Sequence, residues 1–282
     1  MTLDAPYRGP GPGRPEDLPL PPASMPLRRD GRWRKRWRYV GVYEEELMLC
    51  AGVARVGPSR QAWWAIWDRE GRVLHERTRM LLGRARVHVE PGLVHVEDGD
   101  GAIHLRLADE RFDVEVVTPD ERSYTWTRKG LALATGTVRA GGRGWALEGR
   151  RAFIDESAGY HPRHTAWEWS AGLGEARDGR PVAWNLVRGV HDSPRDSERT
   201  VWVDGRPVEV GPVEFAADLS SVSFAEGGRL GFAEEAVRRR DDNLLVFRSR
   251  YEQPFGAFSG ELPGAGRLAR GFGVMERHDV HW

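Results

Sequence analysis

Arg36-Trp37-Arg38-Tyr39-Val40-Gly41-Val42-Tyr43 is the stretch that decides the fold, because aromatic residues recur there at almost every second position. Successive side chains of a β-strand point to opposite faces, so a period of two predicts a strand with one apolar face. The same alternation returns in Arg86–Glu90, His104–Leu107 and Phe112–Val116. We therefore predict half-buried antiparallel strands from about residue 36 onward.

Turn-forming residues separate these segments at short intervals, as in Pro91-Gly92, Glu97–Gly101 and Arg139–Gly142. Connections of this length join antiparallel neighbours and are too short for parallel crossovers. The pattern predicts an all-β protein, either a meander barrel or a sandwich. Only Ala233–Arg240 has a helix-like pattern, and it is equally consistent with a strand that runs into a charged loop.

The second half has the same pattern of short strands and turns as the first half, without repeating its sequence. We expect strands at Thr165–Leu173, Pro181–Val187, Arg199–Val203, Val213–Ala217, Leu244–Tyr251, Ala257–Leu262 and Ala269–Glu276. Eight prolines between residues 6 and 26 exclude a helix or a central strand and predict an extended arm, interpreted as a strap over a barrel edge or mouth rather than a floppy terminus. The expected division is an arm at 1–30 and β-barrels or sandwiches at 31–150 and 151–282.

The charge balance argues against large polyanionic partners. The 282 residues contain 42 Lys and Arg and 42 Asp and Glu, so no net positive field attracts nucleic acid. The longest apolar runs are too short for a membrane span, and no secretion signal is recognisable. The one cysteine, Cys50, lies in an apolar run and predicts a buried thiol in a reducing cytoplasm. The oligomeric state stays open.

Twelve tryptophans are more than a core of this size needs. Trp63 and Trp67 share one predicted strand, Trp167 and Trp169 share one face of another, and Trp184 follows on the next. An indole offers a flat apolar surface and one N–H donor, which suits a cavity for an isoprenoid, a polyene or a sugar ring. Aromatic packing between two sheets explains the same residues without a ligand.

The densest polar stretch runs from Asp155 to Trp169 and ends on the Trp167-Glu168-Trp169 motif. If a strand begins near His164, His164 and Glu168 face away from the two tryptophans. A carboxyl group held among indoles favours its protonated form and can act as a general acid. Asp155 is the first candidate for this acid, with Tyr160 as its hydrogen-bond partner. The alternative is a surface loop whose acids pair with neighbouring arginines.

Histidine pairs at His161 and His164, and at His278 and His281, raise the question of a metal. Two histidines three residues apart point to opposite faces of a strand, so each pair would need an irregular turn to chelate. We therefore expect neither a functional metal nor a cofactor. His88 and His104 are expected to face solvent.

Several motifs together resemble a bacterial family known only as a domain of unknown function. They are Lys35-Arg36-Trp37, Asp155–Tyr160 followed by Trp167-Glu168-Trp169, Asn185, Val203-Asp204-Gly205, Pro254–Gly260 and Gly273-Val274-Met275-Glu276. That family is in turn similar to the lipocalin-like group of hydroxyneurosporene synthase (a carotenoid hydratase), tocopherol cyclase and certain fungal pericyclases.

The resemblance implies two consecutive lipocalin-like antiparallel β-barrels or curved sandwiches, with a pocket in or between them. It implies Asp155, Tyr160 and Glu276 as catalytic groups. The expected ligand-binding residues are Trp167, Trp169, Trp184, Asn185, His161, His164 and Glu168.

Three classes of function follow from these observations. The first is a cofactor-free hydratase, cyclase or isomerase that acts on an isoprenoid or lipid-like molecule. The second is a carrier of such a molecule, and the third is a carbohydrate-active or carbohydrate-binding sandwich. A closed cavity with Asp155 or Glu276 facing inward favours the enzyme, apolar walls alone favour the carrier, and an open groove with exposed tryptophans favours the sugar.

Overall fold

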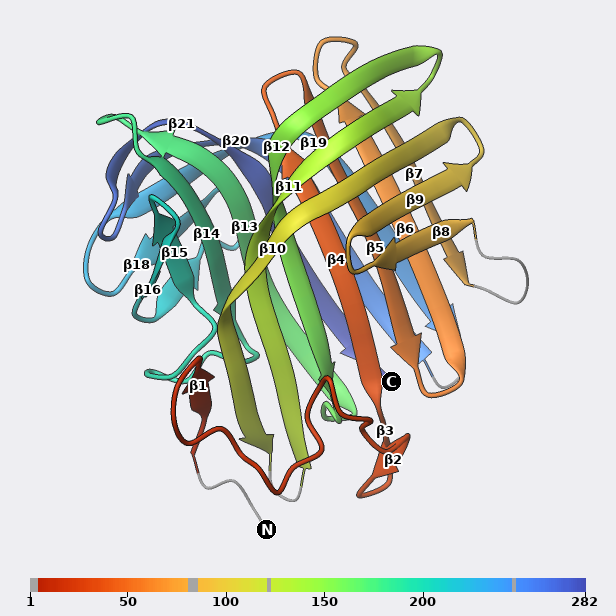
Figure 1. Cartoon of the computed structure of the whole chain (residues 1–282), viewed down its shortest axis with the longest axis vertical. Helices are drawn as coiled ribbons and strands as arrows, with labels where there is room; N and C mark the ends of the chain where they lie inside the picture. The colour runs from red at the N-terminus through yellow and green to blue at the C-terminus, as the bar shows by residue number, and fades with distance from the viewer. Residues whose placement is uncertain (1–4, 81–85, 121–122, 245–246) are drawn as a thin grey trace.

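The protein is built from two large antiparallel sheets (Figure 1). The structure, a computed structural model, describes residues 5–80, 86–120, 123–244 and 247–282. Over these residues it contains strands, turns and bends but no α-helix, which confirms the predicted all-β class. No helix within the described part is long and apolar enough to cross a membrane.

The two sheets have the same topology. The first comprises β4 (Lys35–Tyr43), β5 (Leu47–Val56), β6 (Ser59–Asp68), β7 (Val73–Met80), β8 (Val87–Glu90), β9 (Leu93–Asp98), β10 (Gly101–Asp120), β11 (Ser123–Ala140) and β12 (Arg143–Gly159). The second comprises β13 (His164–Ala176), β14 (Pro181–Arg188), β15 (Thr200–Val203), β16 (Arg206–Glu209), β17 (Val213–Phe215), β18 (Ser221–Phe224), β19 (Arg229–Leu244), β20 (Phe247–Leu262) and β21 (Gly266–His281). In each, the first strand pairs with the last, three strands follow on one side and four on the other.

The proline-rich arm lies against the lower end of the first sheet in Figure 1. It contains β1 (Tyr7–Gly9), which pairs with β10, and the hairpin of β2 (Arg28–Arg29) and β3 (Arg32–Trp33). Its apolar side chains Leu20 and Met25 are buried in a cluster with Trp126 and Tyr160. Arg8 donates a 2.9 Å hydrogen bond to Thr200 Oγ1, so the arm also holds the second sheet. The predicted extended arm is confirmed.

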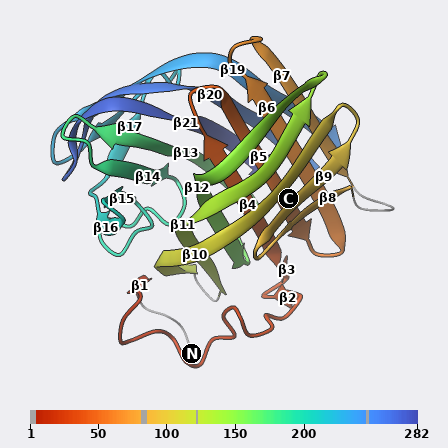
Figure 2. The same ribbon diagram turned by 45° about the horizontal axis from the view of Figure 1, so that its top comes forward.

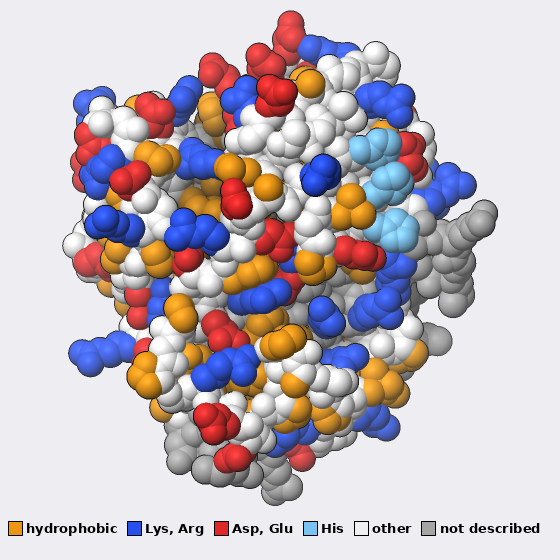
Figure 3. All heavy atoms as spheres, viewed as in Figure 1, with side chains coloured by type: hydrophobic (Ala, Val, Ile, Leu, Met, Phe, Trp, Pro, Cys, Tyr) orange, Lys and Arg blue, Asp and Glu red, His pale blue; other side chains and the backbone are white. Residues whose placement is uncertain are grey.

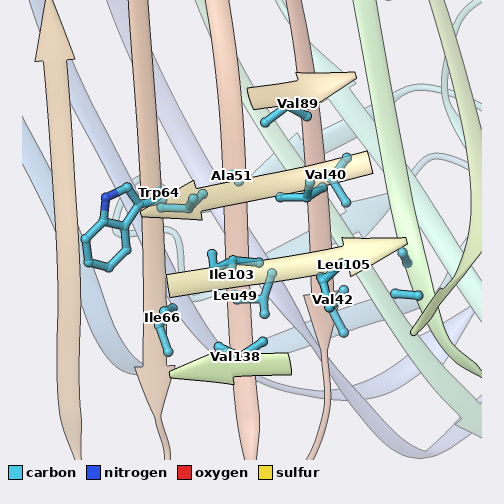
Figure 4. Close-up of a cluster of buried hydrophobic side chains, with 14 of the residues drawn as sticks. Val40, Val42, Leu49, Ala51, Trp64, Ile66, Val89, Ile103, Leu105 and Val138 are labelled. Atoms are coloured by element: carbon cyan, nitrogen blue, oxygen red, sulfur yellow. The ribbon is translucent and has the colours of Figure 1, made fainter. Parts of the chain in front are cut away.

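Each sheet curls around an apolar core of its own. In the first sheet, Val40, Leu49, Ile103 and Val138 lie close together on different strands, and Trp64 belongs to the same cluster (Figure 4). The second sheet encloses a separate cluster that includes Trp184, Phe215 and Phe258.

A third apolar cluster lies between the sheets. It combines Tyr39, Tyr43 and Phe153 of the first sheet with Trp169 and Phe255 of the second. The long strand β19 passes behind the first sheet and contacts β7 (Figures 1 and 2).

The second sheet changes the burial of β4 from what the sequence predicted. Val40 and Val42 of β4 face the core of the first sheet, while Tyr39 and Tyr43 face the second sheet. The alternation predicted from the sequence is present, but residues 39–43 are buried on both faces rather than on one. The prediction of a half-buried strand is therefore wrong for this segment, because a second sheet covers its outer face.

Two ambiguous segments are strands. Ala233–Arg240, which had a helix-like pattern, lies within β19 and pairs with β20 over most of its length. The polar stretch that begins at Asp155 forms the end of β12 up to Gly159. The passage from one sheet to the other is therefore confined to residues 160–163.

Histidines form a row on the outer face of β8, β9 and β10, where His88, His95 and His104 follow one another (Figure 3). The rings of His95 and His104 stack with a centroid distance of 4.7 Å. Both His88 and His104 have partly exposed side chains, as expected from their alternation with buried valines and leucines. This row lies away from the space between the sheets.

A glycine opposite a tryptophan lets one bulky ring lie flat on the second sheet. Gly172 of β13 pairs directly with Trp184 of β14. A Cβ atom on Gly172 would lie 2.1 Å from Trp184 Cζ2, which is far inside van der Waals contact. The indole thus occupies the space that a side chain at residue 172 would need.

We expect Gly172→Ala to lower the free energy of unfolding by about 1–3 kcal/mol, because the added methyl group overpacks a buried site. Chemical denaturation of the variant and wild type measures the change. Gly231→Ala is the matched control, since its Cβ would lie 3.4 Å from the nearest atom, Ser259 Oγ. Equal stability losses in the two variants would contradict the proposed role of the glycine.

Candidate active site between the two sheets

A cavity of about 460 Å³ lies between the two sheets. Strands β4, β5, β6, β7, β11 and β12 supply one wall, and β13, β14, β19, β20 and β21 supply the other. Aromatic and ionisable side chains are prominent in its lining, among them Trp37, Trp63, Lys129, Asp155, His161, Trp167, Trp169, His191, Glu198, Arg238, Tyr251, Glu276 and His278. The volume falls within the range of small-molecule sites in proteins.

Aromatic rings form much of the cavity wall. Trp37 of β4 and Trp167 of β13 stack across the junction of the sheets, with centroids 6.4 Å apart and planes 8° from parallel. His161 lies 5.1 Å from Trp37, and His278 lies 4.5 Å from Trp167. Flat indole faces suit apolar or ring-shaped ligands.

The two stacked tryptophans belong to equivalent positions of the repeated topology. β4 and β13 are the first strands of their sheets, and each pairs with the last strand, β12 or β21. Trp37 pairs with Ser157, and Trp167 pairs with His278, in the same antiparallel sense.

Each tryptophan also binds a carboxyl group two residues before its strand partner. Trp37 Nε1 donates to Asp155 Oδ2 at 3.4 Å, and Trp167 Nε1 donates to Glu276 Oε1 at 2.8 Å. Asp155 and Glu276 are therefore structural counterparts. The site consists of two similar halves that meet at the indole stack.

Glu276 is surrounded by neutral donors. Besides Trp167, the hydroxyl of Tyr251 and Nε2 of Gln253 each donate to Glu276 Oε2 at 2.9 Å. Its side chain is buried, and burial raises the pKa of this carboxyl above its ordinary value, although the donors oppose the shift. Glu276 is thus held in a setting that favours the protonated form more than water does.

Asp155 lies beside a buried cation. Lys129 Nζ contacts Asp155 Oδ1 and lies 3.3 Å from Glu198 Oε2. Burial lowers the pKa of Lys129, but the attraction of the two carboxylates outweighs this effect and raises it overall. Burial and repulsion from Glu198 raise the pKa of Asp155, and Lys129 opposes that rise. Lys129 therefore stays charged and compensates a carboxylate at this end.

The two halves differ at the neighbouring strand, where Lys129 of β11 takes the place that Gln253 has in β20. Lys129 pairs with Asp155 across β11 and β12, and Gln253 bonds Glu276 across β20 and β21. Arg238 Nη1 donates to Gln253 Oε1 at 3.0 Å, which turns the amide nitrogen toward Glu276. One carboxyl thus has a cation in contact, and the other has an amide.

Several predicted residues line this cavity and several lie elsewhere. Asp155, His161, Trp167, Trp169 and Glu276 line it. Tyr160, Trp184 and Asn185 do not line it. Tyr160 is buried against the arm and its hydroxyl donates to the Pro26 carbonyl at 2.7 Å, so it is not the partner of Asp155. Trp184 belongs to the core of the second sheet, and Asn185 accepts from Trp169 Nε1 at 2.8 Å.

His164 and Glu168 lie on the outer face of β13, as the alternation predicts. Glu168 forms ion pairs with Arg188 and Arg277. His164 stacks on His281 with centroids 4.1 Å apart, and its Nε2 lies 3.2 Å from Asp279 Oδ1.

The groups His164, Asp279 and His281 hold possible metal ligand atoms within 4.8 Å of one another. Two imidazoles and a carboxylate suit zinc or a similar ion. All three residues are exposed, and none of them lines the cavity. The histidines three residues apart, His161 and His164 or His278 and His281, do not converge, because one of each pair lines the cavity and the other lies outside.

Sequence reasoning missed Lys129, Glu198 and Tyr251. Lys129 lies in a strand of mixed residues, where one buried lysine cannot be told from an exposed one. Tyr251 and Glu276 are 25 residues apart and meet only because β20 pairs with β21. The available signal was that Asp155 and Glu276 each lie two residues before the strand partner of a tryptophan, Trp37 or Trp167. This signal can be seen only once the strand register is known.

Comparisons with known proteins give a family and a fold. A family model described as domain of unknown function DUF2804 matches residues 86–282, well over half of the chain, in line with the resemblance seen in the motifs. No curated protein matches the chain.

Among solved structures, the chain is similar to a protein of Nitrosomonas europaea provisionally assigned as AttH, with a TM-score of 0.54 and 14% identity over 92% of this chain and 98% of that one. It is also similar to kievitone hydratase of Nectria haematococca, with a TM-score of 0.46 and 8% identity over 86% and 88% of the two chains. A third similar structure is CghA, with a TM-score of 0.42 and 11% identity over 88% of each chain. Of these three similarities, only the one to the AttH structure carries an argument, and that argument concerns the fold alone.

The half-buried histidine His278 predicts a loss of stability in acid. Burial lowers its pKa to about 4, whereas an unfolded histidine has a pKa near 6.5. The unfolded state therefore binds more protons than the folded state below about pH 6.5, and the free energy of unfolding falls as the pH falls toward 4.

We expect His278→Gln to remove on the order of 2 kcal/mol of this pH dependence between about pH 7 and pH 4.5. Denaturant unfolding at a series of pH values measures it. His164→Gln, which replaces a histidine on the exposed outer face, is the control for the substitution itself. An unchanged slope in His278→Gln would show that this imidazole is not held neutral.

Proposed function

The chain belongs to the DUF2804 family, and from its cavity we propose that it binds a hydrophobic small molecule and converts it by cofactor-free acid–base catalysis. Hydration, cyclisation or isomerisation of an isoprenoid or other lipid-like substrate fits this chemistry. The observation that carries the proposal is the pair of counterpart carboxyls, Asp155 and Glu276, in an aromatic cavity with different neighbours.

The cavity walls support an apolar substrate. Trp37, Trp63, Trp167 and Trp169 present indole surface to a volume of about 460 Å³. Such surface gains free energy by dispersion and by removing apolar ligand area from water. The same rings can stabilise a positive charge that develops on a substrate, because the face of an indole carries negative charge density.

The different neighbours of the two carboxyls support different roles. Burial raises the pKa of Glu276 above its ordinary value even though neutral groups donate hydrogen bonds to it, so we assign Glu276 as the proton donor. Asp155 contacts the Lys129 cation, which favours its charged form, so we assign it as the proton acceptor. This assignment differs from the sequence-based hypothesis, in which Asp155 was the acid.

The proton transfers balance in a simple cycle. Glu276 donates its proton to an alkene or an oxygen of the substrate, and a positive charge develops next to the indole rings. Asp155 then takes a proton from an adjacent carbon in an isomerisation or cyclisation, or from an attacking water in a hydration. Proton exchange with solvent returns Glu276 to its acid form and Asp155 to its carboxylate form.

A carrier is the second candidate function. Apolar walls alone would hold a lipid-like ligand, and burial of two carboxyl groups only adds a desolvation cost. The inward position of Asp155 and Glu276 therefore favours the enzyme. A sugar-binding groove would need flat exposed tryptophans, whereas Trp169 is 4% exposed and Trp167 is partly buried.

Glu276→Gln is expected to bind substrate without converting it, because the amide keeps the shape of the side chain but cannot act as the acid. Turnover falls by about a hundredfold or more. Mass spectrometry of small molecules that co-purify with wild type and variant from the same host measures the outcome. The molecule that accumulates in Glu276→Gln, once incubated with wild type, gains the mass of one water or changes retention time at constant mass.

The matched control is Glu168→Gln, which removes a carboxylate on the outer face of β13 and leaves the cavity intact. It should behave as wild type. A carrier predicts the same bound molecule in wild type and Glu276→Gln, with no conversion. That result, or co-purified molecules that are carbohydrates, would reject the enzymatic proposal.

The pH profile of turnover gives an independent check. Because Glu276 must be protonated to donate, activity falls as the pH rises through its pKa. Trp167→Phe removes a hydrogen bond that lowers this pKa, so the alkaline limb of the profile moves to higher pH. Trp63→Phe is the control, since Trp63 lines the same cavity and its Nε1 bonds neither carboxyl. A shift in the opposite direction, or equal shifts in both variants, would contradict Glu276 as the acid.

A further inference from the structure

His161 has an unused capacity for hydrogen bonds at the Asp155 end of the cavity. Its side chain lines the cavity and is 2% exposed, yet neither Nδ1 nor Nε2 has a hydrogen-bond partner among the described residues. The ring packs against Trp37, with centroids 5.1 Å apart, and lies edge-to-face with His191. A buried polar group without a partner costs about 1–3 kcal/mol, which calls for an explanation.

A second imidazole beside it also has a free nitrogen. His191 Nδ1 is 2.8 Å from Thr118 Oγ1, while its Nε2 has no partner within the described structure. The two rings are 6.4 Å apart and nearly perpendicular. Unmet donors and acceptors therefore gather at one end of a cavity whose other walls are largely aromatic.

Both imidazoles are neutral at neutral pH. Burial lowers the pKa of His161 well below 6.5, and the nearby Lys35 cation adds to this effect. Burial lowers the pKa of His191 to about 3. A neutral imidazole offers one N–H donor and one lone pair, which together match a hydroxyl group, and the N–H alone matches a carbonyl.

The charges at this end disfavour an anionic group. Asp155 and Glu198 both face Lys129, and Lys35, another cation near His161, already contacts the His161 carbonyl at 3.1 Å and the Trp282 ring. A ligand carboxylate or phosphate placed here would meet further repulsion in a buried setting. A neutral oxygen avoids this cost and still satisfies the imidazole.

We propose that the substrate carries a neutral oxygen function, a hydroxyl or a carbonyl, which hydrogen-bonds to His161 next to Asp155, with its apolar ring or chain against the Trp37 and Trp167 stack. This inference rests on the proposed function and narrows its substrate class to oxygenated hydrophobic molecules. His161 is a binding residue in this account and takes no part in proton transfer.

The test compares the binding of naphthalene and 2-naphthol to the full-length protein by equilibrium dialysis near neutral pH. The two probes share one ring system and differ by a neutral hydroxyl. We expect wild type to bind 2-naphthol about fivefold more tightly than naphthalene, the gain of one neutral hydrogen bond. In His161→Phe the advantage disappears, while naphthalene binding stays within about twofold of wild type, because the aromatic wall is kept.

Two further variants separate recognition from a general disturbance of the fold. His164→Phe changes an exposed imidazole outside the cavity and should leave both affinities unchanged. His161→Asn keeps a donor and an acceptor and should restore part of the preference for 2-naphthol. It also provides a second reading if His161→Phe does not fold.

The outcomes separate this inference from the function on which it rests. If wild type binds both probes equally, or if the preference for 2-naphthol persists in His161→Phe and in His161→Asn alike, the inference is overturned and the apolar cavity stands. If wild type binds neither probe, the apolar binding site itself is wrong, and the proposed function falls with it.

Discussion

The pairing of the first strand of each sheet with its last strand is the constraint on which the site depends. It brings Asp155 beside Tyr39 in one sheet and Glu276 beside Trp169 in the other. Because the same closure occurs twice, two tryptophan–carboxyl pairs arise at equivalent places. The sheets then meet along these strands, and both carboxyls end in one cavity away from bulk water.

The burial of these carboxyls is a cost that the surrounding structure offsets unequally. Lys129 supplies a full charge to one of them, while Gln253 supplies only an amide to the other. A charge in contact favours the ionised form much more than a dipole does. Divergence at a single strand position thus gives two related carboxyls different neighbours, a cation at Asp155 and an amide at Glu276.

The sequence predicted the strands better than it predicted their surroundings. The alternation around Tyr39 identified β4 correctly, but it carries no information about the second sheet that buries the other face of this strand. Asp155 could be chosen because it precedes the Trp167-Glu168-Trp169 motif, and Glu276 because it ends a motif on which the family resemblance rests. Lys129 could not, since its role depends on a register between β11 and β12 that only the folded chain defines. Tyr160 was placed by proximity in sequence, yet the arm covers it.

The protonation state of Glu276 is the most direct test of this account. Infrared difference spectra between wild type and Glu276→Gln, recorded over a pH titration, isolate the carbonyl stretch of this one protonated carboxyl. The account predicts that the signal persists above the ordinary pH range of a glutamic acid and disappears at higher pH. A signal lost at or below the ordinary glutamate pKa would show that Glu276 is a carboxylate, and the assignment of acid and base would be wrong.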